Sequence, residues 1–264
     1  AAINDDDWMT VIGTVHEQGG ALPSAIGYDP AELNNYCQIF RSPLFMTRTA
    51  MKTRLRTGDQ IKEAKREALM LLNQEKEKAF IFGELKASTG AKGQPMYATR
   101  GLISHITTYA SSNVIDAGGP LSESEWDGYL EQVFRYGSSE KLALVGSGMM
   151  AVLAQLAKNG GIQLTAVAND DAYGMKLVQY ITPFGILYLK THPIFSDHPV
   201  WRYNGLIVDT AHLVERYVDD IQYLKNRQTA GDDAQADEYL NEAGIETHFA
   251  ETHAYIKNVT SYAP

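Results

Sequence analysis

The chain has 264 residues, of which 44% are hydrophobic and 21% charged, and its formal net charge is −9. These proportions are typical of a globular protein with a substantial core, and they exclude a chain that is disordered throughout. The acidic balance disfavours tight generic binding of nucleic acid, because such binding depends on Lys and Arg neutralising phosphates.

Neither the cysteine content nor the hydropathy pattern indicates secretion or a membrane. The single cysteine, Cys37, cannot form an intrachain disulfide, and we expect a buried or half-buried thiol in a reducing compartment. The first ten residues, AAINDDDWMT, lack the basic and apolar regions of a secretory signal. No stretch approaches the ~18–20 apolar residues of a membrane helix, so we expect no membrane partner.

The first 57 residues contain few apolar side chains in any periodic pattern. Residues 1–32 hold three consecutive aspartates, paired glycines and two prolines, which predicts an extended arm without its own core. Residues 36–57 combine short apolar/polar alternations with basic residues, and we expect a solvated hairpin or long loop there. The basic residues are Arg41, Arg48, Lys52, Arg54 and Arg56.

Residues 59–83 carry the strongest helical pattern in the chain. Asp59 is a suitable N-cap, and Gly83 follows the last periodic residue. One narrow apolar stripe, formed by Ile61, Ala64, Ala68, Leu71, Leu72 and Ala79, faces away from the Lys and Glu residues. A helix of about 22 residues spans ~33 Å, which is typical of a structural spine lying on a surface.

The remaining elements are shorter. Residues 83–102 read as a glycine-rich turn between ordered segments, without the spacing of a phosphate-binding loop. A capped helix is expected over 121–136, with Trp126, Leu130, Val133 and Phe134 on its apolar face. Thr182-Pro183-Phe184-Gly185 predicts a hairpin turn, and short strands are expected at 206–208, 213–218, 221–224, 245–249 and 254–259. The polar stretch 226–244 predicts a protruding acidic loop.

Residues 141–160 raise the possibility of a dinucleotide site. An apolar run leads into Gly146-Ser147-Gly148-Met149-Met150-Ala151, which matches G-x-G-x-x-A, and Asp170 or Asp171 follows at about the distance that the motif requires. However, only one β-α-β unit is present and hairpin signals follow it, whereas a Rossmann half needs two. We therefore expect a strand, a tight turn and a helix without cofactor, in which Met149, Val152, Leu153 and Leu156 pack on a sheet.

Other candidate sites are less specific. His192 and His198 flank an aspartate, a combination that zinc or iron accepts, but both precede prolines and lack a third nearby ligand. His248 and His253, five apart, lie on opposite faces of a regular strand. No nucleophile motif is complete, so we expect neither a metal nor a catalytic residue.

The order of these parts resembles the major capsid proteins of tailed bacteriophages with the Hong Kong 97-type fold. The stretches that carry the resemblance are 35–40 with Thr49-Ala50, 75–83 (EKEKAFIFG), 99–102 (TRGL), 126–141 (WDGYLEQVFRYGSSEK), 182–193 and 251–256 (ETHAYI). They are spread over residues 34–260 and resemble, in turn, the extended loop, the spine helix, the segment after it, the axial-domain helix, the following hairpin and the closing strand.

The resemblance implies an α+β, Hong Kong 97-like fold with a defined division of the chain. It implies an N-terminal arm (1–32), an extended loop (33–57), a spine helix with the first part of a peripheral domain (58–110), an axial domain (111–204) and a strand-rich return (205–264). No cofactor and no enzymatic activity are implied.

The implied function is that of a shell subunit. Copies would assemble as hexamers and pentamers in the host cytoplasm into the icosahedral or elongated head of a virion, around double-stranded DNA held without sequence-specific binding. Portal, scaffolding and decoration proteins are the other expected partners. On this interpretation Arg48, Lys52, Arg54 and Arg56 contact a neighbouring subunit, with acidic residues such as those in 226–239 as their partners.

Two alternatives remain at this stage. An encapsulin-like nanocompartment subunit would share the fold but enclose enzymes. A NAD-dependent oxidoreductase would use the G-x-G-x-x-A at 146–151.

Overall fold

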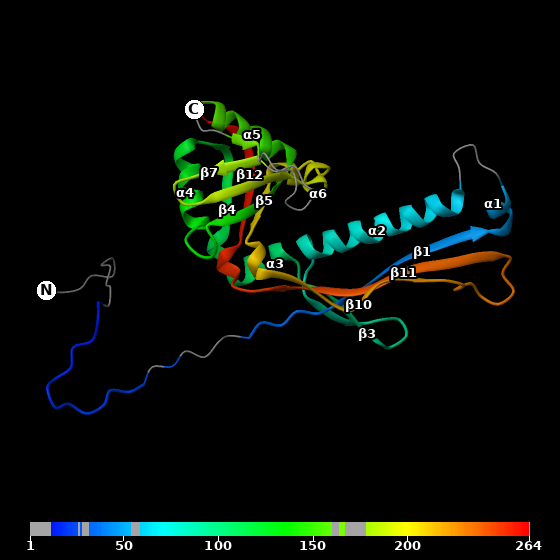
Figure 1. Cartoon of the computed structure of the whole chain (residues 1–264), viewed down its shortest axis with the longest axis horizontal. Coiled ribbons are helices and arrows are strands. Elements are labelled where there is room, and N and C mark those ends of the chain that lie inside the picture. Colours follow the sequence, from blue (N-terminus) through cyan, green and yellow to red (C-terminus); the bar gives the residue numbers. More distant parts are fainter. Residues whose placement is uncertain are drawn as a thin grey trace. The chain divides into compact units, whose positions relative to one another are not determined.

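The computed structural model describes residues 12–25, 27, 32–53, 59–159, 164–166 and 178–263. The chain divides into two compact units, Ala1–Asn34 and Asn35–Pro264 (Figure 1). The described residues of the first unit include no helix or strand, and the side chains of Ile12, Val15 and Leu22 are almost fully exposed. The second unit contains every helix and strand of the described chain.

A three-stranded antiparallel sheet is formed by segments far apart in the sequence. Its order is β1 (Gln38–Thr47), β11 (Ala234–Thr247) and β10 (Leu213–Leu224), so β11 is the central strand. The pairing of β1 with β11 runs from Gln38 opposite Ala243 to Thr47 opposite Ala234. Two expectations are therefore wrong: 36–57 is no local hairpin, and most of 226–244 is a strand rather than a loop.

The polar sequence of β11 forms a strand because its side chains find partners on the neighbouring strands. Asp237 accepts hydrogen bonds from the hydroxyl of Tyr223 and, at 3.0 Å, from the backbone of Asn226. Buried Glu238 lies between the guanidinium groups of Arg41 and Arg227. A buried carboxylate is tolerated when it is paired, so this strand does not need an apolar face.

The long helix α2 (Gln60–Phe82) lies beside β1 and β11 (Figure 1). Asp59 caps it by accepting a hydrogen bond from the backbone of Ile61, and Gly83 ends it, so the predicted helix is confirmed. Ala68 and Leu72 of the predicted stripe are buried, but Leu71 is 51% exposed. The buried face of the helix is therefore narrower than the predicted stripe, which included Leu71. A five-residue helix, α1 (Arg48–Lys52), follows β1.

A seven-stranded mixed sheet has the order β4-β12-β9-β5-β8-β7-β6. Its strands are β4 (Val114–Leu121), β5 (Glu140–Val145), β6 (Leu164–Ala166), β7 (Val178–Ile181), β8 (Ile186–Thr191), β9 (Gly205–Val208) and β12 (Ala254–Tyr262). The predicted hairpin is confirmed, since β7 pairs with β8 and Thr182 donates its backbone N–H to the carbonyl of Gly185.

The short elements lie around the two sheets. The turn-like stretch after α2 is a two-stranded hairpin of β2 (Lys86–Thr89) and β3 (Pro95–Ala98). The others are α3 (Leu102–Tyr109), α4 (Glu123–Val133), α5 (Ser147–Asn159), α6 (Pro193–Ser196), and the 3-10 turns η1 (Ser111–Asn113), η2 (Trp201–Tyr203), η3 (Thr210–His212) and η4 (Ala250–Thr252). The predicted helix of 121–136 is confirmed as α4, with a capping box between Ser122 and Glu125.

Both faces of the seven-stranded sheet are covered, and neighbouring residues along a strand point to different cores. Ile207 of β9 packs with α4 and α5, in a core that includes Trp126, Leu130 and the predicted residues Met149, Val152, Leu153 and Leu156. Leu206 and Val208 pack on the other face with Ile81 of α2, Ile106 of α3 and Ile245 of β11. This second core joins the seven-stranded sheet to the three-stranded sheet.

Candidate assembly surfaces

The dinucleotide-like window forms the predicted strand, turn and helix, β5 and α5, but the turn is filled by the chain itself. A Cβ on Gly146 would lie 2.4 Å from the carbonyl oxygen of Arg202, and one on Gly148 would lie 2.7 Å from the ring of Tyr203. The backbone N–H of Gly146 donates to the carbonyl of Asn204 at 2.9 Å. The glycines are therefore required for close packing against η2, where a dinucleotide site needs room for phosphates. Asp170 and Asp171 lie outside the described residues.

The histidine pairs have separate structural roles. His198 stacks on Trp201 with ring centroids 4.1 Å apart, and its Nδ1 accepts hydrogen bonds from the backbone N–H groups of Val200 and Trp201. His192 is half-buried, and burial lowers its pKa. Among the described residues, no group of three or more His, Cys, Asp or Glu is placed to hold a metal ion.

Cys37 immediately precedes β1 and is half-buried, as expected. Burial, followed by the nearby carboxylate of Glu242, raises the pKa of its thiol. The group is therefore held in the thiol form, which is the opposite of what a reactive cysteine needs.

A buried lysine connects three segments where the two sheets meet. Lys141 of β5 is 1% exposed, and its Nζ donates to the carbonyl oxygens of Val133 (2.8 Å), Tyr136 (2.8 Å) and Thr252 (2.6 Å). Loss of hydration lowers its pKa to about 8, an effect that the charge of Asp209 partly opposes. The ammonium group thus holds the end of α4 against η4, the turn through which the chain passes from β11 to β12.

A second buried group fixes the other passage between the sheets, from β9 to β10. The carboxylate of Asp209 accepts hydrogen bonds from the backbone N–H groups of Ser138 (2.8 Å) and Ala211 (3.1 Å). Its own backbone N–H donates to Nδ1 of His253 at 3.1 Å. Burial, then the neighbouring His105 and Lys141, lowers the pKa of His253 to about 4, so this imidazole is neutral at pH 7. Both passages are therefore anchored to the same α4–β5 turn.

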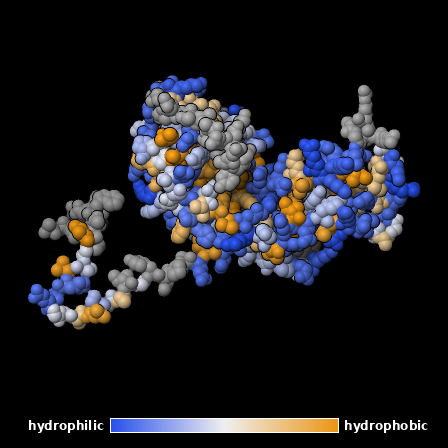
Figure 2. Space-filling view, in the orientation of Figure 1, coloured by the Kyte–Doolittle hydropathy of each residue, from blue (hydrophilic) through white to orange (hydrophobic). Residues whose placement is uncertain are grey.

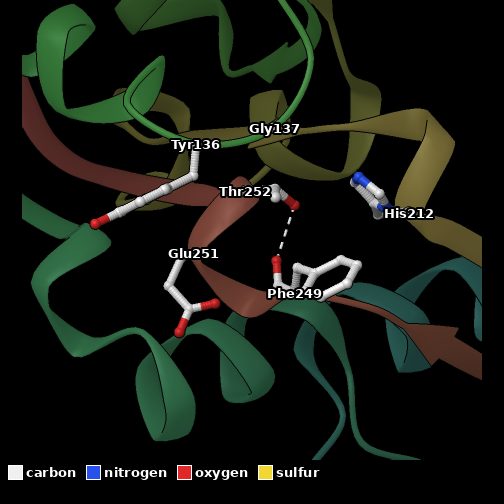
Figure 3. Close-up of a pocket in the computed structure, with 6 residues that line it drawn as sticks. All are labelled: Tyr136, Gly137, His212, Phe249, Glu251 and Thr252. Carbon is white, nitrogen blue, oxygen red and sulfur yellow. Dashed lines mark hydrogen bonds between the residues drawn. The ribbon is translucent and has the colours of Figure 1, made fainter. Parts of the chain in front are cut away.

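A pocket of about 420 Å³ opens beside these anchors and is lined by Tyr136, Gly137, His212, Phe249, Glu251 and Thr252 (Figure 3). The side chains of Tyr136 and Glu251 lie on one side of Thr252, and those of His212 and Phe249 lie on the other. Tyr136 is 57% and Phe249 65% exposed. Phe249 has a left-handed backbone, with φ of 50°, a conformation that bulky side chains rarely adopt.

Two of the sequence-predicted basic residues, Arg48 and Lys52, lie at the other end of the three-stranded sheet. Arg48 begins α1, and its Nε is 3.0 Å from a carboxylate oxygen of Asp233 in the same chain. Asp233 belongs to the acidic stretch that we expected to meet these residues from a neighbouring subunit. Lys52 lies in the last turn of α1 and is exposed. Arg54 and Arg56 lie outside the described residues.

Large apolar side chains are exposed on α2 and the three-stranded sheet, and Figure 2 shows apolar patches within an otherwise hydrophilic surface. On β1, Ile39 is 58% and Phe45 63% exposed, because the strand alternates between the face covered by α2 and the open face. Met70 and Leu71 are exposed on α2, and Tyr217 and Val218 on β10. Groups of exposed apolar side chains mark interaction surfaces.

Sequence reasoning missed the pocket and the buried lysine. Side chains alternate between the two faces of a strand, and Lys141 lies on the same buried face of β5 as Ala143 and Val145. A lysine at a buried strand position is unusual, so this spacing could have identified Lys141 from the sequence. Glu251 and Phe249 carry no local signal, since their role depends on the turn between β11 and β12.

Comparisons with solved structures agree with this architecture. The SrpI encapsulin of Synechococcus elongatus PCC 7942 is similar with a TM-score of 0.62 at 12% identity, over 86% of this chain and 76% of that one. The satellite phage P4 procapsid matches 98% of this chain and 88% of its own, and the cyanophage A-1(L) capsid 84% and 77%, both with a TM-score of 0.55 and 12% identity. The long helix beside a three-stranded sheet, joined to a mixed sheet covered on both faces, is therefore a Hong Kong 97-like, α+β capsid fold.

Sequence comparison identifies the family. The SU10 major capsid protein family matches residues 8–260, so the chain belongs to that family. It is 26% identical to the major capsid protein of Pseudomonas phage PaMx41 over 219 residues, 80% of this chain and 52% of that protein. The chain thus spans about half the length of this curated relative. That family is one of phage major capsid proteins, and the likeness to an encapsulin reflects the shared fold.

Within the described residues, none of the helices is both long and apolar enough to cross a membrane.

Proposed function

We propose that copies of this chain assemble as hexamers and pentamers into the closed, icosahedral or elongated shell of a phage head. The observation that carries this proposal is the exposure of Ile39, Phe45, Met70, Leu71, Tyr217 and Val218, each more than half exposed in the single chain. Burial of apolar area contributes roughly 25 cal/mol per Å², so contacts that cover these side chains favour association.

The proposal gives each part of the chain a role. Residues 1–32 act as the arm, 33–57 as the extended loop, and 58–110 as the spine helix with the first part of the peripheral domain. Residues 111–204 form the axial domain, and 205–264 return through both sheets. A single chain that presents an uncovered sheet, an uncovered helix face and an extended arm has several separate surfaces to offer to neighbours.

The basic residues Arg48, Lys52, Arg54 and Arg56 contact a neighbouring subunit in this proposal. Because Arg48 already pairs with Asp233, charge at this end of the sheet is partly balanced within the chain. Reversing the charge of Arg54 and Arg56 together is expected to reduce particle yield and leave the subunit fold unchanged. Wild-type yield from the double variant, counted by electron microscopy, would exclude a role for these two residues.

The interior of the shell holds double-stranded DNA without sequence-specific binding. The net charge of −9 supports this assignment, because a shell that attracted DNA strongly would oppose its movement during packaging and ejection. Portal, scaffolding and decoration proteins are the remaining proposed partners, and assembly takes place in the host cytoplasm.

Sedimentation velocity and negative-stain electron microscopy of the expressed full chain test the proposal. Closed hollow particles of uniform size are the expected result. A chain that stays a monomer or small oligomer at all concentrations and salt conditions would contradict it.

A further inference from the structure

We propose that neighbouring subunits meet head to tail: α1 of one copy docks at the pocket between the two sheets of the next copy, with Lys52 against Glu251. This inference rests on the proposed shell assembly and specifies one of its contacts. Its observations are a preformed pocket with an acidic rim at one end of β11 and an exposed, unmatched lysine at the other.

The two sites cannot meet within one chain. Thr47, which directly precedes α1, pairs with Ala234 at the start of β11, whereas Glu251 follows Thr247 at the end of that strand. An extended strand advances ~3.3 Å per residue, so the fourteen residues of β11 separate the two ends by roughly 45 Å. A contact between these ends therefore requires a second copy.

The pocket has the chemistry of a site for a cationic side chain. Two exposed rings, Tyr136 and Phe249, stand at its opening with the exposed carboxylate of Glu251 (Figure 3). A cation gains from the faces of aromatic rings and from a carboxylate together, and it gains more where the site excludes water. Both rings are more than half exposed, and Phe249 packs edge-on against His212 with ring centroids 5.2 Å apart. Exposed aromatic side chains beside a pocket are typical of interface anchors.

The pocket is also held in shape before any partner arrives. Lys141 bonds the carbonyls of both Tyr136 and Thr252, so the two walls are tied through one ammonium group. The hydroxyl of Thr252 donates to the carbonyl of Phe249 at 2.8 Å, and Asn113 donates to the carbonyl of Glu251 at 2.8 Å. Preorganisation of this kind lowers the entropy lost on binding. The strained backbone of Phe249 is maintained in the same network.

Of the two described cations of α1, Arg48 and Lys52, only Lys52 has no partner among the described residues. Arg48 pairs with Asp233, whereas Lys52 is exposed and has no hydrogen bond or ion pair with the described residues. It lies at the end of a short helix, α1, and can therefore approach a pocket without displacing a strand.

A contact between two different surfaces of the same chain is heterologous, and it produces a ring when the rotation between copies closes. The proposed contact is thus of the kind that hexamers and pentamers require. A contact between two equal surfaces would instead stop at a dimer.

A charge exchange in the full chain tests the inference. Lys52→Glu and Glu251→Lys each place like charges across the contact and are expected to lower the yield of closed particles by about tenfold or more. The double variant Lys52→Glu/Glu251→Lys restores opposite charges and is expected to recover most of the wild-type yield. Lys92→Glu, the same change at an exposed lysine in the β2–β3 turn, serves as the matched control and should assemble normally.

The outcomes separate the two proposals. If wild type forms no particles, the shell proposal fails. If wild type forms particles and both single variants give the same particle yield, the Lys52–Glu251 contact is wrong. The contact is also wrong if the double variant still gives a low particle yield while all variants have the melting temperature of wild type. Glu251→Gln and Lys52→Gln, which keep side-chain size, are used where a reversed charge lowers the melting temperature, and an unchanged yield from both would also overturn the contact.

Discussion

Lys141 donates a hydrogen bond of 2.6 Å to the carbonyl oxygen of Thr252, and this bond links β5 of the seven-stranded sheet to the turn by which the chain arrives from the three-stranded sheet. Since the same ammonium group also holds Val133 and Tyr136, one side chain fixes the place where the two sheets meet.

Lys141→Met is expected to lower the free energy of unfolding by about 2–4 kcal/mol at pH 7. Methionine fills a similar volume, but it leaves three carbonyl groups without this donor, and two of these hydrogen bonds are buried. Each unsatisfied buried group is costly. Urea unfolding followed by circular dichroism measures the change. Lys158→Met, at an exposed lysine in the last turn of α5, is the control and should shift stability by less than about 0.5 kcal/mol. Equal stability of the two variants would show that the ammonium is not needed.

The pH dependence of the stability difference between wild type and Lys141→Met gives a separate prediction. The pKa of Lys141 is lowered from 10.5 to about 8 in the folded chain, so between these values the unfolded chain binds more protons. Stability contributed through this group therefore rises as pH increases from about 8 to 10.5. The stability difference between wild type and Lys141→Met should thus grow from pH 7 to pH 10 by roughly 2–3 kcal/mol. A constant difference would contradict the assigned pKa.

His253 predicts a pH dependence of the same sign on the acid side, where stability also rises with pH. Its pKa falls from 6.5 to about 4 on folding, so the unfolded chain binds more protons between these values, and stability is lost as pH falls through them. The loss from this group is roughly 3 kcal/mol by pH 4. In His253→Gln, the amide oxygen can still accept the N–H of Asp209 but does not titrate. Urea unfolding at pH 7 and pH 4.5 should therefore show a smaller loss in the variant, and equal losses would exclude His253 as the source.

Two glycine substitutions separate close packing from helix propensity. Gly146→Ala forces a methyl group against the backbone of Arg202 and is expected to destabilise the chain by more than about 2 kcal/mol. Gly128 lies inside α4 with no atom near the position of a Cβ, so Gly128→Ala should stabilise by about 0.5–1 kcal/mol. Thermal melting of both variants checks the signs. If Gly146→Ala is as stable as wild type, Gly146 is not closely packed against Arg202.

The rim of the pocket can be tested for backbone strain at Phe249. Phe249→Ala and Phe249→Gly both remove the exposed ring, but only glycine adopts a positive φ without steric cost. The glycine variant should therefore be more stable than the alanine variant by about 1 kcal/mol. If alanine is as stable as glycine, the left-handed conformation at this position is not strained.

Elements with a local signal could be predicted from the sequence, whereas pairings between distant segments could not. The caps at Asp59 and Ser122 and the apolar stripes behind them are local, and α2 and α4 lie where they were expected. The polarity of β11 was misleading, because Asp237 and Glu238 are matched by Tyr223, Arg41 and Arg227 from other parts of the chain. Tertiary partners of this kind override strand propensity.

The glycine motif at 146–151 shows a related limit. The sequence predicted the strand, the turn and the helix, but the reason for the two glycines is the approach of Arg202 and Tyr203, more than fifty residues later. Likewise, the pocket at Glu251 exists only because β9, β11 and the α4–β5 turn converge. The resemblance to the capsid family supplied the fold that the local patterns could not.

Negative-stain electron microscopy of the purified full chain, with sedimentation velocity on the same sample, shows directly whether copies of the chain form a closed shell. Closed, hollow particles of uniform diameter are expected, together with smaller rings when Lys52 and Glu251 are intact and assembly is limited by low protein concentration. A monodisperse monomer or dimer under all conditions would contradict it.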